Sequence, residues 1–305
     1  MTFSTGGNFE GGRVRTGKGK AVAAGGGVGL VGLLVVAAAY IFGGNQVGSV
    51  VSGIVQQAGS GTQVISGGDD ESGYVGDCSA EQANSDRNCR LSATVQALDA
   101  YWAVQLPKQG NVDYTQPTVV SFSGETSTAC GQANSSTGPF YCPGDETIYV
   151  DVSFYDLLQS EYGSSGGPLA EEYVIAHELG HHIQDELGLL TQASSQEGAS
   201  GGSVRTELMA DCLAGMWAGS AATTVDPDTG KTFLEPITDA QLKDALSAAA
   251  SVGDDHIQQT SGGYVDPESF THGTSDQRQY WFSVGYQKGT LKACDTFNAT
   301  SLDRP

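Results

Sequence analysis

The sequence predicts an α+β fold, mostly helical with a small sheet, in one exported domain behind an amino-terminal transmembrane helix. Three observations predict it. Two β-branched or aromatic runs precede a series of segments with helical periodicity, an order typical of α+β domains. An uncharged apolar run of 22 residues stands near the amino terminus. The six cysteines are an even number, as is typical of disulfide-bonded proteins in an oxidising compartment.

The first 42 residues predict membrane attachment. Residues 1–20 hold four of the 14 Lys and Arg residues and only one acidic residue, Glu10. The apolar run over residues 21–42 would span about 33 Å as a helix, enough for a bilayer core of about 30 Å. The positive-inside rule then predicts a single-pass protein with its amino terminus in the cytoplasm and its domain extracellular or periplasmic. A cleaved signal peptide, with cleavage near residues 37–39, is the alternative.

The rest of the chain divides into a linker and one domain. Residues 43–76 contain 10 glycines, a composition typical of a flexible linker. The exported domain is predicted over residues 77–305. Beyond residue 20 the chain has 10 basic and 34 acidic residues, out of 14 and 35 in the whole chain. A surface this acidic repels phosphate backbones, so nucleic acid is excluded as a partner, and nothing in the sequence indicates an oligomeric state.

The elements of the domain follow from residue periodicity and from the residues at their ends. Apolar residues at helical intervals predict a helix over residues 90–106, and β-branched or aromatic runs predict strands over residues 117–124 and 147–154. Residues 130–142, between these strands, are predicted to form a loop closed by its two end cysteines. An initial proline, two acids in the first turn and a final glycine predict a helix over residues 168–188. Further helices are predicted over residues 203–219, 239–252 and 275–288.

Proximity in the sequence favours one pairing of the cysteines, although six cysteines allow many. Two pairs lie close together along the chain, and the remaining two cysteines are left for each other. No CxxC pair is present, which disfavours a zinc site made of cysteines. The predicted disulfides are Cys78–Cys89, Cys130–Cys142 and Cys212–Cys294.

Residues 176–184 read AHELGHHIQ and hold three of the five histidines. On a helix His177 and His181 stand one turn apart and about 40° apart in azimuth, so both can bind one metal ion. His182 lies about 140° from His177 and is predicted to be structural or at the surface. With Glu178 between the pair, the pattern is HExxH, in which two imidazoles bind zinc and the glutamate acts on a water molecule.

A catalytic zinc site usually takes a third protein ligand and leaves one position open. Glu207 is the best candidate, because it follows His181 by 26 residues on the next predicted helix. Asp211 stands four residues later on the same face, where it can orient a zinc-bound imidazole through its other nitrogen. Asp185 and Glu186 are less favoured, because they belong to the same helix as the histidines and cannot easily reach the metal.

Several segments together resemble one family. HELGHHIQ, ELMADCLAGMW, SFTHGTSDQRQYWFSVGY and CDTF are similar, in this order, to the bacterial family described as putative neutral zinc metallopeptidases. GPFYCPGDETIYVD resembles the strand region of the same family. The resemblance covers roughly residues 78–297, nearly the whole of the predicted exported part.

The resemblance implies a zincin-like fold, a Zn²⁺ cofactor and a membrane-anchored enzyme that hydrolyses peptide bonds in a peptide or protein substrate. His177, His181 and Glu207 would bind zinc, as in gluzincins, which take a glutamate as third ligand. Glu178 would be the general base, and Asp211 would orient His177. Zincins commonly bind an extended peptide beside an edge strand, so the strand over 147–154 is expected to form the edge of the cleft.

The oxyanion that develops on the substrate needs a second stabiliser besides zinc. His272 is the predicted catalytic residue for this role, with Tyr264 or Tyr149 behind it. His256, next to two aspartates, is predicted to form a local ion pair or cap.

Two other functions remain open. The chain could be a non-catalytic, zinc-stabilised extracellular binding protein, or a zinc amidase acting on cell-wall peptides. Glu178 argues against the binding protein, because a structural site has no use for an unligated glutamate beside the metal. The sequence gives no cleavage specificity.

Overall fold

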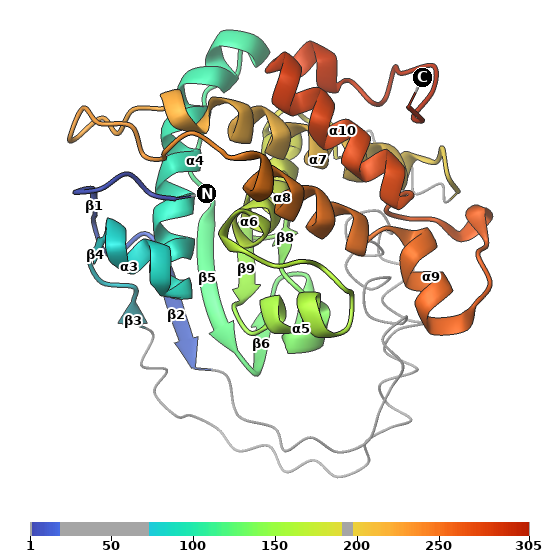
Figure 1. The fold of residues 1–305 in the computed structure, drawn as a ribbon, viewed down its shortest axis with the longest axis horizontal. Helices are drawn as coiled ribbons and strands as arrows, with labels where there is room; N and C mark the ends of the chain where they lie inside the picture. Colours follow the sequence, from blue (N-terminus) through green and yellow to red (C-terminus); the bar gives the residue numbers. More distant parts are fainter. Residues whose placement is uncertain (1, 19–72, 191–197, 305) are drawn as a thin grey trace.

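The computed structural model describes residues 2–18, 73–190 and 198–304 (Figure 1). The predicted transmembrane helix over residues 21–42 lies outside them, as does nearly all of the linker over residues 43–76. Among the described helices, none has both the length and the apolar character needed to cross a membrane.

The domain is α+β, about half helical, with small sheets. The main sheet has five strands in the order β3-β2-β5-β9-β8. β2 is parallel to β5, and β5 is parallel to β9, whereas the outer strands β3 and β8 are antiparallel to their neighbours. The bounds are β2 (Arg15–Lys18), β3 (Gly73–Tyr74), β5 (Thr118–Ser123), β8 (Phe140–Cys142) and β9 (Thr147–Asp151).

Two short two-stranded sheets complete the β structure. β1 pairs with β4, and β6 pairs with β7, both antiparallel. Their bounds are β1 (Asn8–Phe9), β4 (Cys78–Ser79), β6 (Glu125–Thr128) and β7 (Gly131–Asn134).

The helices pack around α6, which is buried along most of its length. α6 contacts α4, α7 and α8, and α10 packs against α7 and α8. In Figure 1, α3 and α4 lie at the left of the view and α9 and α10 at the right, with α6 and the strands β5, β8 and β9 between them. The bounds are α3 (Ala80–Ser85), α4 (Arg87–Gly110), α5 (Phe154–Ser160), α6 (Pro168–Glu186), α7 (Gly202–Ser220), α8 (Asp239–Ser251), α9 (Asp254–Gly262) and α10 (Ser275–Lys288).

The local sequence explains the position of the central helix. Gly167, at φ 96°, precedes α6 in a backbone conformation that favours glycine, and Pro168 opens the helix with its fixed φ. Its side chains are buried on every face, because strands and α4 cover one side and α7 and α8 the other. The predicted helices over 168–188, 203–219, 239–252 and 275–288 are confirmed to within two residues at each end.

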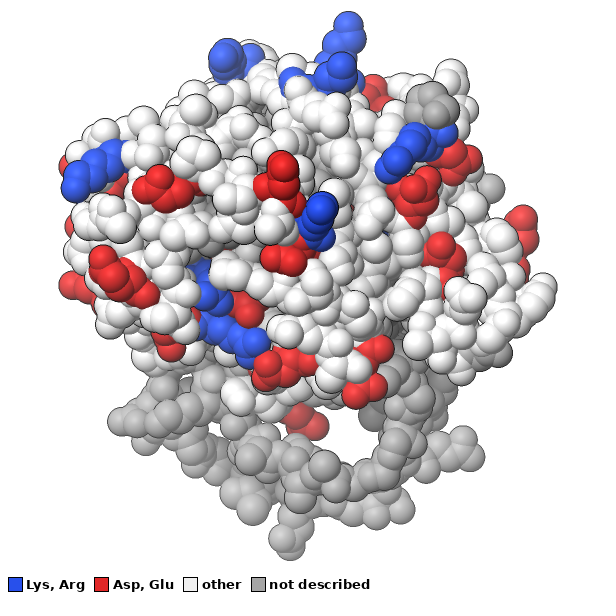
Figure 2. Space-filling view, in the orientation of Figure 1, with Lys and Arg blue, Asp and Glu red and all other residues white. Residues whose placement is uncertain are grey.

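The three predicted disulfides are present, and the described residues include no free cysteine. Disulfides are typical of proteins outside the cytoplasm, so they indicate an extracytoplasmic domain. Acidic side chains are spread over the face that Figure 2 shows, in keeping with the net charge of −21.

Two predictions for the middle of the domain are wrong. Residues 130–142 are not simply a loop, because they contain β7 and β8. The strand over 147–154 ends at Asp151 and is not an edge strand, because β9 lies between β5 and β8. The edge of the sheet nearest to α6 is β8. Its three residues are too few to show the alternation that predicts a strand.

The predicted boundary at residue 77 also needs correction, because residues 2–18 are part of the fold. β2 lies inside the main sheet, and the side chains of Phe3, Phe9 and Val14 are buried. The guanidinium of Arg13 bonds to the buried carboxylate of Asp99, with Nε 2.6 Å from Oδ2. Strands of one sheet lie on the same side of a membrane. Residues 2–18 and the rest of the described domain therefore lie on one side of a membrane, unlike the predicted arrangement of a cytoplasmic amino terminus and an exported domain.

Candidate metal centre

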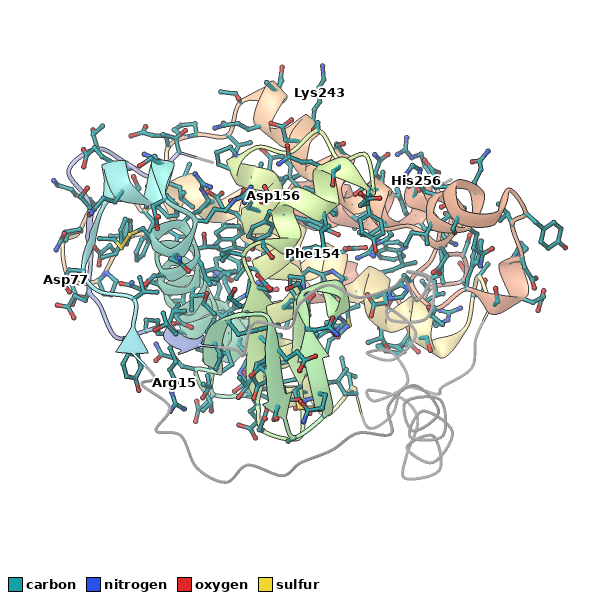
Figure 3. The ribbon with its side chains drawn as sticks, turned by 90° about the horizontal axis from the view of Figure 1, so that it is seen from below. Arg15, Asp77, Phe154, Asp156, Lys243 and His256 are labelled. Carbon is teal, nitrogen blue, oxygen red and sulfur yellow. A yellow bond between two sulfur atoms is a disulfide. The ribbon has the colours of Figure 1, made fainter. Side chains whose placement is uncertain are left out.

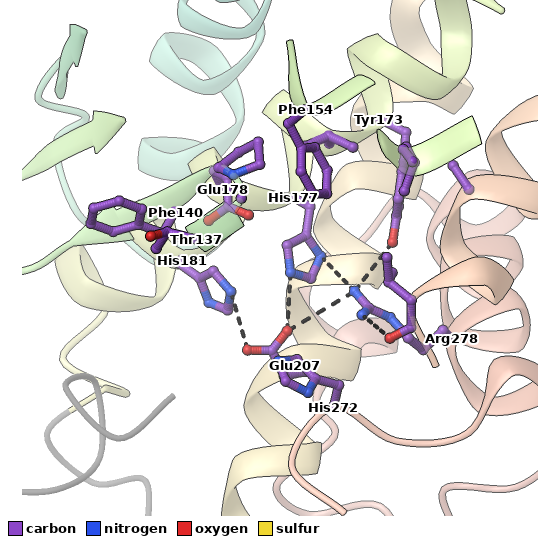
Figure 4. A pocket seen from close by; sticks show the side chains of 16 residues that line it. Thr137, Phe140, Phe154, Tyr173, His177, Glu178, His181, Glu207, His272 and Arg278 are labelled. Carbon is purple, nitrogen blue, oxygen red and sulfur yellow. Dashed lines mark hydrogen bonds and ion pairs between the residues drawn. The ribbon is translucent and has the colours of Figure 1, made fainter. Parts of the chain in front are cut away.

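Three buried side chains from α6 and α7 converge on one point. One ligand atom from each of His177, His181 and Glu207 lies within 4.8 Å of the others. Glu207 Oε2 is 3.1 Å from His177 Nε2, and Glu207 Oε1 is 3.5 Å from His181 Nε2 (Figure 4). The structure therefore brings together all three residues predicted to bind the metal.

A close contact between α6 and α7 makes this convergence possible. Gly180 stands between the two histidines, and a Cβ at this position would lie 3.1 Å from both Cα and the carbonyl oxygen of Ala210. The missing side chain lets the two backbones approach. Glu207, one turn before Ala210 on α7, can thus reach the imidazoles.

The other nitrogen of each imidazole is held by an acceptor. His177 Nδ1 lies 2.9 Å from Asp211 Oδ1, which also accepts from the Tyr173 hydroxyl. His181 Nδ1 lies 2.8 Å from Gln184 Oε1. The prediction that Asp211 would contact His177 agrees with this geometry. Gln184 was missed, although its position three residues after His181 on one helix was a usable signal.

These partners determine where the imidazole protons lie. Gln184 Nε2 donates to the Thr206 carbonyl, so Gln184 Oε1 is the atom that faces His181 and can only accept. Nδ1 of His181 therefore carries the proton, and Nε2 presents a lone pair toward Glu207. With Nδ1 of both rings directed at an acceptor, the Nε2 atoms and the Glu207 carboxylate are left to share one cation at this buried point. Two imidazoles and one carboxylate are a donor set that zinc favours.

The electrostatics of the metal-free site separate the two histidines. Burial lowers the pKa of His177, but Asp211 and Glu207 outweigh burial and raise this pKa to about 10. Burial lowers the pKa of His181 to about 4. Burial would raise the pKa of Glu207, but the two imidazoles hold it below its ordinary value. Without metal, His177 thus carries a second ring proton at neutral pH, with Nδ1–H facing Asp211 and Nε2–H facing Glu207.

Glu178 lies beside the ligands without belonging to them. Its carboxylate lines the same cavity and accepts the Tyr141 backbone N–H at 3.0 Å through Oε2. Burial raises the pKa of Glu178 to about 7. Tyr141 belongs to the edge strand β8, between Pro139 and Pro143, which have no N–H. Of the alternate residues Pro139, Tyr141 and Pro143, only Tyr141 has a backbone N–H, and this N–H already donates to Glu178.

His272 reaches the cavity from the loop before α10, and Figure 4 shows its ring beside Glu207. Its Nδ1 is 3.1 Å from Asp254 Oδ1, and Asp254 Oδ2 accepts the backbone N–H groups of Thr271, His272 and Gly273. Burial lowers the pKa of His272, but Asp254 outweighs burial and raises it.

The two tyrosines predicted behind His272 for oxyanion stabilisation are not among the residues that line the cavity. Tyr264 is 76% exposed, and the Tyr149 hydroxyl bonds to Asp145. Asp254 was missed because it lies 18 residues earlier, at the start of α9, and only the fold brings the two together.

The remaining histidines lie outside the site. His182 is buried, with Nδ1 bonded to the Tyr141 hydroxyl and Nε2 to the Thr115 carbonyl, so its predicted structural role is confirmed. His256 bonds to the Tyr162 carbonyl, not to an aspartate. Figure 3 shows His256 on α9, at the side of the molecule opposite Asp77.

The ligands open into a cavity of about 90 Å³. Its polar lining residues include Glu178, His272 and Arg278. Its apolar lining comes from β8, α5, α6 and α8, through Phe140, Phe154, Leu158, Val174 and Ala248. The cavity thus combines the metal-binding residues with apolar side chains.

Comparison with known proteins agrees with this geometry. A family model described as "Putative neutral zinc metallopeptidase" matches residues 4–297. The chain is 52% identical over 221 residues to the uncharacterized protein Rv2575 of Mycobacterium tuberculosis, covering 72% of this chain and 74% of the relative. It is 42% identical over 221 residues to the uncharacterized protein YpfJ of Escherichia coli K12, covering 70% and 73%. No solved structure shows a significant match.

Proposed function

We propose that this chain, which belongs to the putative neutral zinc metallopeptidase family, hydrolyses peptide bonds outside the cytoplasm with zinc and a glutamate general base. A zincin-like arrangement of His177, His181 and Glu207 supports the metal assignment. The observation that carries the proposal is the position of Glu178, which is buried, lines the cavity and is not among the three ligands. A purely structural zinc site does not need such a carboxylate.

The chain's own residues supply the proton transfers. Zinc, when bound, supplies Lewis acidity, which activates water and polarises a carbonyl group. The Tyr141 amide holds Glu178 Oε2, which leaves Oε1 to take the proton of the attacking water. Glu178 then returns this proton to the nitrogen of the leaving amine. A glutamate whose pKa stands near 7 is suited to both transfers at neutral pH.

His272 stabilises the developing negative charge on the substrate oxygen. Its Nδ1 is held by Asp254, so Nε2 is the nitrogen available to donate into the cavity. Three backbone N–H groups that also bond to Asp254 fix the loop around the ring, so the donor is oriented before substrate binds. The predicted catalytic role of His272 is retained on this basis.

The substrate is a peptide or protein with an apolar side chain near the scissile bond. The side chains of Phe140, Phe154, Leu158 and Val174 line the same cavity as the metal-binding residues. Burying an apolar side chain there is favourable at about 25 cal/mol per Å². β8 offers little to a strand-like substrate, because its flanking prolines lack N–H groups and its Tyr141 amide is taken.

The protein acts outside the cytoplasm, as the disulfides support. Since residues 2–18 fold with the domain, we place both on the outer side. The apolar run over residues 21–42 would then attach to the membrane without a single crossing of the bilayer.

The proposal is tested by comparing the wild-type chain with Glu178→Gln in a peptide-library cleavage assay and in a zinc assay. We expect about one zinc in both proteins and loss of nearly all cleavage in Glu178→Gln. Glu186→Gln is the matched control, because Glu186 lies on the same helix and contacts Thr115 rather than the cavity. Equal cleavage by Glu178→Gln and wild type would refute the mechanism, and zinc binding without cleavage in wild type would support the binding-protein alternative.

A further inference from the structure

Arg278 is a buried cation at the edge of the metal centre. It lies on α10, its side chain is 4% exposed, and it lines the cavity. Figure 4 shows its guanidinium next to His177 and Glu207. No part of the proposed reaction uses it.

The guanidinium of Arg278 donates two parallel hydrogen bonds to the carboxylate of Asp211. Arg278 Nε lies 2.8 Å from Asp211 Oδ2, and Nη2 lies 3.0 Å from Oδ1. Oδ1 is also the oxygen that faces His177 Nδ1. Two bonds fix both the plane and the rotation of the carboxylate, which a single contact cannot do. Arg278 thus fixes the plane of the Asp211 carboxylate, and the Tyr173 hydroxyl adds one further bond to Oδ1.

Close packing of two helices keeps Arg278 in place. A Cβ on Gly285 would lie 1.8 Å from the Cys212 carbonyl oxygen, and one on Gly215 would lie 2.0 Å from the Phe282 carbonyl oxygen. The backbones of α10 and α7 thus touch. Gly285 is two turns after Arg278, and Gly215 is one turn after Asp211, so the contact aligns the two side chains.

Arg278 contributes to the charge balance of the centre. Glu178, Glu207 and Asp211 bring three negative charges when ionised, and all three are buried. A divalent ion supplies two positive charges, and Arg278 supplies the third, with Nη2 4.0 Å from Glu207 Oε2. Buried charge without a counter-charge is costly, so this balance favours a metal-ready, ionised set of carboxylates.

We infer that Arg278 is a positioning residue of the metal centre, acting through Asp211 to fix the His177 imidazole for zinc. The inference rests on the proposed zinc site but not on peptidase activity. Loss of the guanidinium leaves Asp211 free to turn, and His177 then loses its oriented acceptor. Changes to such outer partners typically lower metal affinity by about 10- to 100-fold.

The test measures zinc affinity, by chelator competition, and the visible absorption of the Co²⁺-substituted full-length protein. We expect Arg278→Met to bind zinc about 10- to 100-fold more weakly and to change the Co²⁺ spectrum, which reports ligand geometry. Arg278→Lys should bind zinc more tightly than Arg278→Met but more weakly than wild type. Lysine keeps the positive charge but cannot form the two parallel bonds of a guanidinium. Arg205→Met is the control, since Arg205 bonds to backbone carbonyls away from the cavity.

A double variant distinguishes a positioning role of Arg278 from a general effect on stability. It can also be used if Arg278→Met alone does not fold. Asp211→Asn with Arg278→Met removes both charges together. If Arg278 acts through Asp211, zinc affinity in the double variant should equal that of Asp211→Asn alone. Independent losses in the two variants, or unchanged affinity and spectrum in folded Arg278→Met, would overturn the inference. Absence of zinc binding by the wild type would instead overturn the proposed function and remove the basis of this inference.

Discussion

Gln184 links the second histidine of the metal site to the neighbouring helix: it accepts from His181 Nδ1 at 2.8 Å and donates to the Thr206 carbonyl at 2.7 Å. Thr206 is the residue before Glu207, so this amide connects two metal-binding side chains across α6 and α7. Gln184 is completely buried, and no water-exposed group can replace it.

Gln184→Leu should therefore weaken zinc binding by about 10- to 100-fold, because His181 loses the acceptor that fixes its tautomer. Zinc affinity measured against a chelator checks this. Gln105→Leu, a partly exposed glutamine on α4, should leave the affinity unchanged. Equal affinity in Gln184→Leu and wild type would mean that the amide has no role in ligand orientation.

Zinc uptake should release about one proton near pH 7. The pKa of His177 is raised to about 10 in the metal-free site, so the ring is protonated at neutral pH and zinc must displace this proton. His181, with a pKa of about 4, is already neutral and releases none. Affinity should thus fall about tenfold per unit as pH drops from 9 to 7. Calorimetry in buffers of different ionisation enthalpy measures the released protons, and a value near zero would contradict the expectation.

His272→Ala should lower kcat about 100-fold while zinc content stays the same, because the lost group stabilises charge only during the reaction. Asp254→Ala should also lower kcat, because it removes the acceptor that holds the His272 ring and the three backbone N–H groups of its loop. Steady-state kinetics with a metal assay tests both. His256→Ala is the control, and a comparable loss of kcat there would point to general damage.

Gly180→Ala should destabilise the protein by about 1–3 kcal/mol and weaken zinc binding, because its Cβ would press on the Ala210 backbone at 3.1 Å. Helix propensity alone would give the opposite sign, a gain of about 1 kcal/mol. Thermal unfolding distinguishes the two directions. Gly17→Ala, where the nearest atoms lie 4.0 Å from the new Cβ, should be tolerated.

Deletion of residues 2–18 should lower Tm and promote association, because it leaves β5 with an open edge and Asp99 without Arg13. Thermal unfolding and light scattering of the full-length and truncated chains provide the measurement. Arg13→Ala alone should lower Tm by less, since β2 remains in the sheet. A fragment of residues 77–305 as stable as the full chain would show that the amino-terminal strands are dispensable.

The metal ligands were predictable because the signal for them is local or nearly so. The HExxH spacing on one helix places His177 and His181, and Glu207 is the first well-placed acid of the next helix. The partners of the ligands were harder, since Arg278 and Asp211 are separated by 67 residues and meet only through packing of α10 on α7. The periodicity of a single helix cannot predict a contact between side chains of two different helices.

The strands β2 and β8 were not predicted, for a different reason. β2 reads RTGK, a polar sequence without the β-branched alternation that predicts a strand, and its pairing with β5 depends on residues more than 100 positions away. β8 has only three residues, enclosed by prolines. Charge counting therefore separated the amino-terminal residues from the domain, although the apolar residues Phe3, Phe9 and Val14, which are buried in it, were visible in the sequence.

Because Thr16 is paired with Gly73, the chain leaves the sheet at β2 and re-enters it beside the same strand. A single proteolytic cut between residues 19 and 72 would thus nick the protein without shedding its domain. The first 18 residues would stay bound through β2 and the Arg13–Asp99 ion pair, as one half of a two-chain complex. Release would require either a second cut or withdrawal of β2 from the middle of the sheet.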